Sequence, residues 1–274
     1  MDSKLQIRIQ RYGWDLACED YEPLWRQQLT AARSALLAAA SLVEAEQVLD
    51  VACGTGLLTF EAARLVGPAG HVAGVDLSGR MIDAARRMPC TNVSFRRMDA
   101  QKLDLPSQSV DAVLCGLGLM YVPDPLAAVA EMLRVLRPGG RVALAVWGRR
   151  SQCGWAPVFE VVDAEVSSEV CPLFFNLGDD NQLAGLCEQA GFQVFANRRL
   201  NSTLVYADAE AACDAAFVGG PVALAWSRFD ESARLRARQR YLSAIEPWRH
   251  QTGYRIPGEF VIVAARKPVL FNGA

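Results

Sequence analysis

The chain has 274 residues, of which 51% are hydrophobic and 21% charged, so it can bury a full core and is not a disordered chain. Its 28 basic and 30 acidic side chains give a net charge of −2. This balance argues against a general nucleic-acid binder, whose affinity depends on concentrated positive charge. The longest apolar runs, 34–43 and 112–123, fall short of the roughly 18 to 20 residues that span a bilayer.

Two further features predict the compartment. The N-terminus carries no apolar export signal, so we expect a soluble, cytoplasmic protein. The eight cysteines form no C-x-x-C pair and no zinc-type spacing. We therefore expect reduced thiols that pack as small apolar side chains, and no metal site.

Short apolar runs alternate with amphipathic segments along most of the chain, which predicts strands and helices in turn. Repeated strand–helix units of this kind predict a parallel sheet with helices on both faces. In chain order we expect helices within 1–45, a strand at 47–52, a helix at 57–66, a strand at 71–77, a helix at 79–87 capped by Ser78, strands at 92–98 and 110–116, a helix at 126–136, a tight turn at 138–140, a strand at 141–147, a helix at 181–190, a strand at 192–200, mainly helix over 206–246 and a last strand at 259–267.

The segment 48–65, VLDVACGTGLLTFEAARL, contains the motif that indicates the chemistry. A buried strand enters a turn with Gly54 and Gly56, and a helix follows at once. Glycine is needed where the backbone approaches a ligand or takes a positive φ, and the N–H groups of such a turn favour ligand oxygens. Asp76 ends the next strand, where a carboxylate can accept both hydroxyls of a ribose. The segment therefore predicts a site for a nucleoside-containing cofactor.

The glycine spacing distinguishes between cofactors. A dinucleotide site requires a third glycine, but Gly56 is followed by Leu57, Leu58 and Thr59. The pattern instead resembles motif I of class I S-adenosylmethionine-dependent methyltransferases. In this sequence it reads Asp50, Ala52, Gly54 and Gly56, with alanine in place of the first glycine.

The resemblance continues through VDLSGRMIDAARR (75–87), MDAQKLDLP (98–106) and residues 110–148. It is greatest to the small-molecule methyltransferases similar to those of ubiquinone and menaquinone biosynthesis. It implies S-adenosyl-L-methionine as the cofactor. By this resemblance the cofactor would contact Asp76 at the ribose, Leu77 and Asp99 and the backbone N–H of Ala100 at the adenine, Cys115 and Leu117 at the methionine moiety, and the aromatic rings of Tyr21 and Trp25.

The resemblance also implies the architecture, an α/β fold with a doubly wound, Rossmann-like sheet. We expect seven mostly parallel strands, helices on both faces and a helical lid. We expect residues 1–45 to form an N-terminal helical cap, 46–202 and 257–270 the methyltransferase core, and 203–256 a lid insertion before the last strand. Aromatic residues gather in the covering segments, which favours an apolar acceptor pocket.

Catalysis of methyl transfer rests mainly on alignment and on exclusion of water. A general base is needed only if the acceptor keeps its proton. The candidates are His250 in the lid segment and Tyr121 just beyond the fourth strand. The chain lacks the Asn/Asp-Pro-Pro-Tyr/Phe motif of enzymes that methylate base amino groups, since 115–118 is Cys-Gly-Leu-Gly. We therefore expect in-line transfer to an apolar or aromatic small molecule.

Two alternatives remain open from the sequence. One is a nicotinamide-dependent oxidoreductase on the same fold, against which the missing third glycine argues. The other is a non-catalytic cofactor-binding subunit, against which the retained Asp76 and Asp99 argue. The acceptor atom and the oligomeric state are not predicted.

Overall fold

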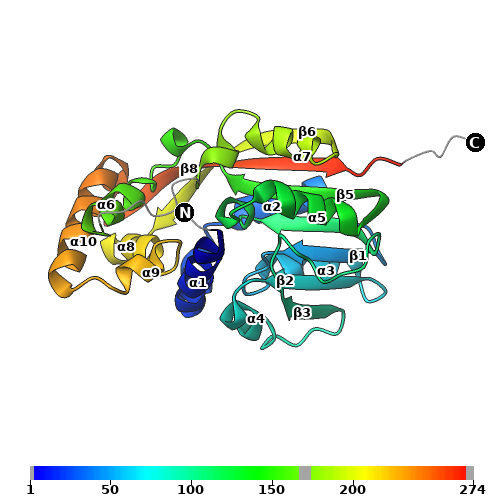
Figure 1. The fold of residues 1–274 in the computed structure, drawn as a ribbon. Coiled ribbons are helices and arrows are strands. Elements are labelled where there is room, and N and C mark those ends of the chain that lie inside the picture. Colours follow the sequence, from blue (N-terminus) through cyan, green and yellow to red (C-terminus); the bar gives the residue numbers. More distant parts are fainter. Residues whose placement is uncertain (1–2, 167–173, 270–274) are drawn as a thin grey trace, which may run out of the picture.

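The computed structural model describes residues 3–166 and 174–269, which form one sheet with helices on both faces and a helical layer at one end (Figure 1). The strands are β1 (Gln47–Val51), β2 (His71–Asp76), β3 (Val93–Arg97), β4 (Val110–Gly116), β5 (Leu136–Trp147), β6 (Gln193–Tyr206), β7 (Arg249–His250) and β8 (Gly253–Arg266).

The order of the strands confirms the predicted doubly wound sheet. It runs β3-β2-β1-β4-β5-β8-β6, and the two-residue β7 pairs with β8 beside this path. The first five strands in this order are parallel, whereas β8 is antiparallel to both β5 and β6. The order reverses between β1 and β4, and in such sheets ligands bind at the carboxyl ends of the strands at this point.

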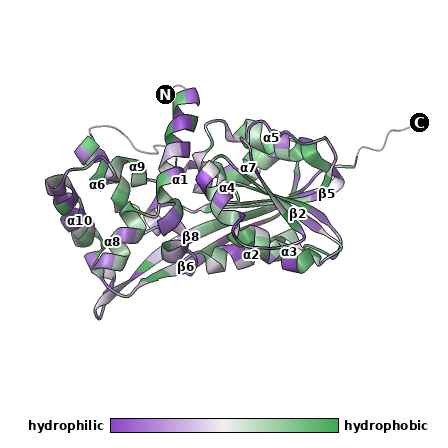
Figure 2. Cartoon of the chain, turned by 90° about the horizontal axis from the view of Figure 1, so that it is seen from below, coloured by the Kyte–Doolittle hydropathy of each residue, from purple (hydrophilic) through white to green (hydrophobic). Residues whose placement is uncertain are grey.

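Helices cover the two faces of the sheet. Figure 2 shows α2 (Thr30–Ala40) and α3 (Leu57–Val66) on one side and α5 (Pro125–Val135) and α7 (Gln182–Gln189) on the other. Strands enclosed in this way need apolar side chains on both faces, and Ala112, Val113 and Leu114 of β4 are fully buried. The remaining helices are α1 (Ser3–Trp25), α4 (Gly79–Ala85), α6 (Pro157–Val166), α8 (Ala209–Phe217), α9 (Ala223–Trp226), α10 (Glu231–Ile245) and the short turns η1 (Leu119–Tyr121), η2 (Arg150–Gln152), η3 (Asn176–Gly178) and η4 (Glu246–Trp248).

Side-chain caps fix the starts of two core helices where the sequence predicts them. The Ser78 hydroxyl accepts a hydrogen bond from Met81 N at 3.1 Å, and the Asp124 carboxylate accepts one from Ala127 N at 3.0 Å. Each cap satisfies an N–H group that the first turn of a helix leaves without an intrahelical partner. Ser78 lies two residues after the end of β2, so its cap also sets where the chain turns away from the sheet.

The strands β6 and β8 are longer than predicted. They extend together beyond the core, with Leu204 opposite Ile256 and Tyr206 opposite Tyr254 in the register. All four side chains are buried, and α8, α9 and α10 lie at this end of the ribbon (Figure 1). The sequence around 201–203 is too polar to predict a strand. Burial beneath these helices stabilises the strand structure there.

The structure also differs from the prediction of a tight turn at 138–140. These residues belong to β5, which begins at Leu136 opposite Val110, and an irregularity in the ladder follows before Arg141 pairs with Ala112. Gly139 takes a φ of +78° and donates its N–H to Lys267 O at 3.0 Å. Pairing with the end of β8 therefore turns the expected loop into a bulged strand.

Two general properties of the described residues bear on the sequence predictions. Among the helices of the described ranges, none combines the length and apolar character that crossing a membrane requires. The described cysteines are free thiols, and all except the exposed Cys90 are buried. Cys171 lies outside the described residues.

A close backbone contact occurs where the order of the sheet reverses. Ala52, directly after β1, and Leu117, directly after β4, take left-handed φ values of +57° and +62°. A Cβ atom on Gly118 would lie 2.2 Å from the Ala52 Cβ, so the two turns touch and only glycine fits at position 118. Left-handed backbone at a non-glycine residue costs about 1–2 kcal/mol, and such strain concentrates at functional sites.

This contact predicts a rescue experiment. Gly118→Ala forces two Cβ atoms into one space and should lower the free energy of unfolding by about 1–3 kcal/mol. Ala52→Gly removes the opposing atom and accepts the left-handed φ without strain, so alone it should stay within about 1 kcal/mol of the natural chain. Urea unfolding measures all three chains, and the double variant should recover most of the loss. If the two effects simply add, the contact does not limit position 118.

Candidate active site

A cleft lies at the carboxyl ends of β1, β2 and β4, beneath α1. Its empty volume is about 800 Å³, which includes the solvent space at its open mouth. The walls are mostly apolar. The lining residues are Ile7, Gln10, Trp14, Tyr21, Val51, Ala52, Gly54, Val75, Asp76, Leu77, Met81, Met98, Asp99, Ala100, Gln101, Gly116, Leu117, Gly118, Tyr121, Val122 and Pro123.

Asp76 is held in this cleft by backbone donors. Its Oδ2 accepts from Gly54 N at 2.9 Å and its Oδ1 from Ser78 N at 2.8 Å. Burial raises the pKa of this carboxyl above its usual value, and the two backbone hydrogen bonds oppose that shift. Each carboxylate oxygen can accept more than one hydrogen bond, so Asp76 keeps acceptor capacity for ligand hydroxyls.

Asp99 is fixed by its own loop. Its Oδ1 accepts from Gln101 N at 2.9 Å and from Gln101 Nε2 at 3.2 Å. The amide oxygen of Gln101 in turn accepts from Asp124 N at 3.0 Å. These contacts tie the loop after β3 to the start of α5, and so they set the position of Asp99 at the cleft wall.

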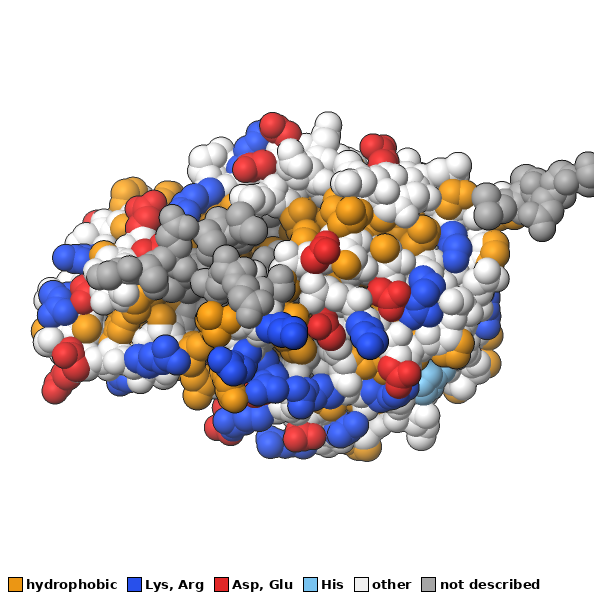
Figure 3. Space-filling model, in the orientation of Figure 1, with side chains coloured by type: hydrophobic (Ala, Val, Ile, Leu, Met, Phe, Trp, Pro, Cys, Tyr) orange, Lys and Arg blue, Asp and Glu red, His pale blue; other side chains and the backbone are white. Residues whose placement is uncertain are grey.

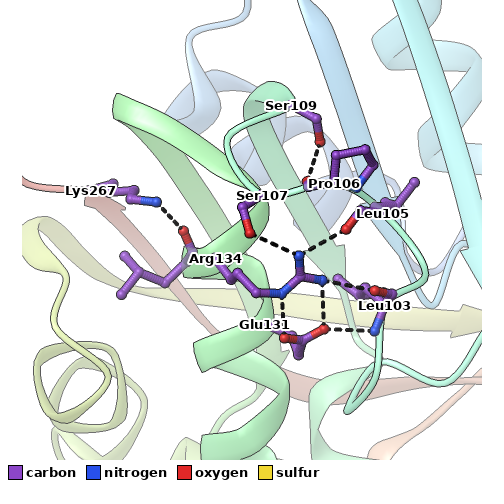
Figure 4. Close-up of polar contacts among 9 residues, drawn as sticks. Leu103, Leu105, Pro106, Ser107, Ser109, Glu131, Arg134 and Lys267 are labelled. Atoms are coloured by element: carbon purple, nitrogen blue, oxygen red, sulfur yellow. Dashed lines mark hydrogen bonds and ion pairs between the residues drawn. The ribbon is translucent and has the colours of Figure 1, made fainter.

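Arg134 fastens the remainder of that loop from behind (Figure 4). Its guanidinium donates to the carbonyl oxygens of Leu103 and Leu105, both at 2.8 Å, and pairs with Glu131 at 2.6 Å. Glu131 Oε2 also accepts from Leu103 N at 2.8 Å, and the hydrogen bond from Arg134 lowers the pKa of Glu131. Lys267 donates to the carbonyl oxygens of Leu133 in α5, at 2.8 Å, and of Leu136, the first residue of β5, at 2.7 Å. This network holds a loop of the cleft that has no regular structure of its own.

A second cavity, with an empty volume of about 510 Å³, adjoins the cleft and shares Tyr21, Ala52 and Gly54 with it. Asp50 lines it from β1, fully buried. Its Oδ2 accepts from Thr59 Oγ1 at 2.6 Å, whereas its Oδ1 has no partner among the described residues. Burial raises the pKa of Asp50 to about 7. A buried carboxylate oxygen without a donor is costly, so this atom fits a ligand that brings one.

Arg33 lines the same cavity from α2, and Thr55 Oγ1 is buried there without a partner in the described chain. The Arg33 side chain is 11% exposed and pairs with Glu61 at 3.1 Å. A cavity with a carboxylate and a guanidinium in its wall fits the ammonium and carboxylate of an amino acid. Together with the ribose-type acceptor at Asp76, these residues fit both ends of S-adenosylmethionine.

A third cavity, here called the aromatic chamber, adjoins the cleft and also the second cavity, with which it shares Tyr21, Leu29 and Leu117. It has an empty volume of about 330 Å³. Trp25 and Trp155 lie with their ring centres 6.2 Å apart, and Trp147 lies 4.8 Å from Trp155. The chamber is lined by Trp14, Tyr21, Leu117 and Tyr121, which also line the cleft, and by Trp25, Leu29, Trp147, Trp155, Gly219, Gly220 and Pro221, which do not.

Most of the residues predicted from sequence come together around these cavities. Tyr21, Ala52, Gly54, Asp76, Leu77, Asp99, Ala100, Leu117 and Tyr121 line the cleft, and Asp50 lines the adjoining cavity.

Three of the predicted cofactor-binding residues lie elsewhere. Gly56 lines neither the cleft nor the adjoining cavity. Glycine is required there because a Cβ atom would lie 2.8 Å from the ring of Phe60 and because the residue takes a φ of +88°. Cys115 is buried inside β4, and burial raises the pKa of its thiol to about 12. Trp25 faces the aromatic chamber instead of the cleft.

The structure does not place His250, the predicted general base, at the site. His250 lies in β7, paired with Gly253 at the tip of the hairpin to β8, and its side chain is exposed. It lines neither the cleft nor the chamber. The tip of the hairpin places His250 at the surface, whereas the neighbouring Tyr254 is buried.

The sequence reasoning missed several residues of the site. Arg33 sits in an alanine-rich helix that carries no motif, and its place in the cavity depends on how α2 packs across the sheet. Trp147 ends a strand and was assigned to the core. Ile7 and Gln10 line the cleft because α1 crosses it, held by a hydrogen bond from Ser78 Oγ to Asp15 Oδ1 at 2.5 Å.

Comparisons with known proteins agree with this geometry. A profile of the methyltransferase domain matches residues 48–140. Demethylmenaquinone methyltransferase of Staphylococcus aureus is 34% identical, over 53% of this chain and 67% of the relative.

Two solved structures show the same fold. A protein of Bacillus halodurans C-125 that is assigned as a methyltransferase superimposes with a TM-score of 0.63 at 20% identity, covering 87% of this chain and 99% of that one. The cyclase SpnF gives a TM-score of 0.58 at 22% identity, covering 90% and 84%. With the cleft, the matched domain and the relative in agreement, the chain belongs to the class I S-adenosylmethionine-dependent methyltransferases, in the family similar to the enzymes of ubiquinone and menaquinone biosynthesis.

Proposed function

We propose that this methyltransferase acts on an apolar or aromatic small molecule that occupies the aromatic chamber. The observation that carries the proposal is the wall that the chamber shares with the cofactor cleft, made by Trp14, Tyr21, Leu117 and Tyr121. These side chains border both cavities, so a cofactor in the cleft and an acceptor in the chamber would meet at this common border. The name of the Staphylococcus aureus relative gives a quinone acceptor for that protein and supports an aromatic acceptor here.

S-adenosylmethionine, when bound, supplies an electrophilic methyl group on a positively charged sulfur. The residues of this chain would hold it at three places. Asp76 would accept from the ribose hydroxyls, and Leu77, Asp99 and the backbone N–H of Ala100 would contact the adenine. At the other end, Asp50 Oδ1 would accept from the ammonium and Arg33 would face the carboxylate.

The contribution of the protein to catalysis is alignment and exclusion of water. In-line transfer needs the acceptor atom opposite the leaving sulfur, and the shared wall fixes that line. Tyr121 would position the acceptor, since its ring packs 5.1 Å from Trp14 and 5.4 Å from Phe174. Burial raises the pKa of Tyr21 to about 12, so this hydroxyl stays protonated and serves as a donor, not as a base.

We propose further that the acceptor is not a nucleic acid. Figure 3 shows basic side chains across the lower part of one face, with acidic side chains among them. Ion pairs join Arg80 with Glu19 at 2.5 Å and Arg96 with Asp104 at 2.7 Å. Mixed charge of this kind does not build the unbroken positive surface that a phosphate backbone requires.

The predicted division of the chain supports the same reaction. We propose that residues 1–45 act as a cap over the cofactor and 203–256 as a lid over the acceptor, with 46–202 and 257–270 as the catalytic core. Ile7 and Gln10 of the first segment line the cleft, and Gly219, Gly220 and Pro221 of the second line the chamber. The first segment therefore borders both cavities, and the second borders the chamber.

Cofactor binding and transfer test the proposed function directly. Calorimetry with S-adenosylhomocysteine should show binding by the natural chain and a loss of at least about tenfold in Asp76→Ala, because one charge-assisted acceptor is worth about 1.5–3 kcal/mol. Radiolabelled S-adenosylmethionine should then transfer methyl to members of a panel of phenols and hydroquinones. Transfer to polar amines or oligonucleotides alone would refute the apolar acceptor.

The raised pKa of Asp50 predicts that cofactor affinity depends on pH. Its raised pKa of about 7 means that it gains its charge between pH 6 and 8, and only the charged form pairs well with the ammonium. Affinity for S-adenosylhomocysteine should therefore rise by up to about tenfold over this interval, as followed by calorimetry.

Asp50→Asn is the matched control, and its affinity should be low and independent of pH over the same range. The free energy of unfolding of the cofactor-free protein should fall as pH rises, whereas cofactor affinity should rise. The folded state holds this proton more tightly than the unfolded state, so the contribution of Asp50 to stability falls as pH rises toward 7. A pH-independent affinity in the natural chain would contradict the assignment of Asp50 to the ammonium.

A further inference from the structure

We propose that Trp25 selects acceptors that carry a carbonyl or hydroxyl oxygen remote from the reacting atom, by donating a hydrogen bond from its indole N–H at the Gly219–Gly220 wall of the aromatic chamber. The inference rests on the proposed function, since it names the class of molecule that the chamber holds. That class is a cyclic, largely apolar carbon skeleton with an oxygen at the end that faces away from the cofactor.

The indole of Trp25 is a buried donor without a partner. The residue is 6% exposed, and its Nε1 makes no hydrogen bond within the described chain. Indole has one hydrogen-bond donor and no acceptor, so the Trp25 side chain has no other polar atom that could form a hydrogen bond in place of Nε1. A buried donor that stays unsatisfied costs about 1–3 kcal/mol, and an acceptor oxygen in the chamber would remove that cost.

Two glycines keep space beside this donor. A Cβ atom on Gly219 would lie 3.3 Å from Trp25 Nε1, and one on Gly220 would lie 4.0 Å from it. Both glycines line the chamber, as does Trp25 itself. A side chain at Gly219 would meet Leu24 Cδ1 at 2.8 Å and would also crowd the indole N–H, so glycine at this position keeps other side-chain atoms away from the donor.

The position of Trp25 within the chamber sets the direction of the bound molecule. Tyr21 and Tyr121 belong to the wall shared with the cleft, where the methyl group would arrive, whereas Trp25 belongs to the wall that is not shared. An oxygen bound by Trp25 is therefore a different atom from the one that is methylated. This separation would hold the acceptor in one orientation and select one of its positions for methylation.

The neighbouring indole of Trp155 does not duplicate this donor. Its Nε1 is also buried without a conventional partner in the described chain, but it lies beside the Cys153 thiol. Burial raises the pKa of that thiol to about 11, and the Trp155 N–H is among the groups that oppose the rise. Since Cys153 does not line the chamber, Trp155 presents its ring to the acceptor and its N–H to the protein.

A matched pair of probes tests the proposal in the cofactor-free protein. 1-Tetralone and tetralin have the same bicyclic skeleton and differ in one carbonyl oxygen, and ligand-observed NMR titration gives both dissociation constants. The natural chain should bind tetralone more tightly. Trp25→Phe keeps an aromatic ring and removes the N–H. It should therefore raise the dissociation constant of tetralone by about three- to tenfold and that of tetralin by less than about twofold.

Two further variants complete the experiment. Trp226→Phe is the matched control, because Trp226 stacks on Phe217 in the lid and does not line the chamber; it should change neither constant. Gly219→Ala crowds the donor while leaving the indole intact, and it should also weaken tetralone more than tetralin, which provides an answer should Trp25→Phe fold poorly.

Equal losses for the two probes, an equal loss in Trp226→Phe, or failure of tetralone to bind would each overturn the role of Trp25. None of these results bears on methyl transfer itself, because binding of S-adenosylhomocysteine and its dependence on Asp76 are measured separately.

Discussion

The contact between the turns after β1 and β4 is the constraint on which the site depends. Ala52 and Leu117 both take left-handed backbone, and Gly118 leaves no room for a side chain against Ala52. Where the two turns meet, they form the floor of the cofactor cleft, and Asp76 is tied to that floor through the N–H of Gly54. The backbone therefore fixes the main polar contact before any ligand arrives, which lowers the ordering cost of binding.

The polar and apolar demands of the reaction are met by different parts of the chain. The sheet supplies the acids, Asp50 from inside β1 and Asp76 from the end of β2, and rigid strands hold them accurately. The aromatic chamber is lined by α1, by the end of β5, by the segments after β4 and β5, and by residues 219–221 before α9. A fold shared with the cyclase SpnF does not determine a reaction, so the acceptor has to be argued from these covering segments.

The sequence predicts the core well and the covering segments poorly. Helix α3 begins and ends where its pattern indicates, and the cofactor acids follow from motifs that lie next to one another along the chain. The chamber does not follow in this way, because Trp25, Trp147 and Gly219 are far apart in sequence and meet only through packing. His250 shows the opposite error, since its place in the expected lid segment suggested a base at the pocket, whereas it lies exposed at the tip of the β7–β8 hairpin.

Helix α1 contacts both cavities. Its first turns supply Ile7 and Gln10 to the roof of the cofactor cleft, and its last residue is Trp25. A single element therefore encloses both the cofactor end and the acceptor end of the site, so a substitution that shifts α1 would alter both cavities at once.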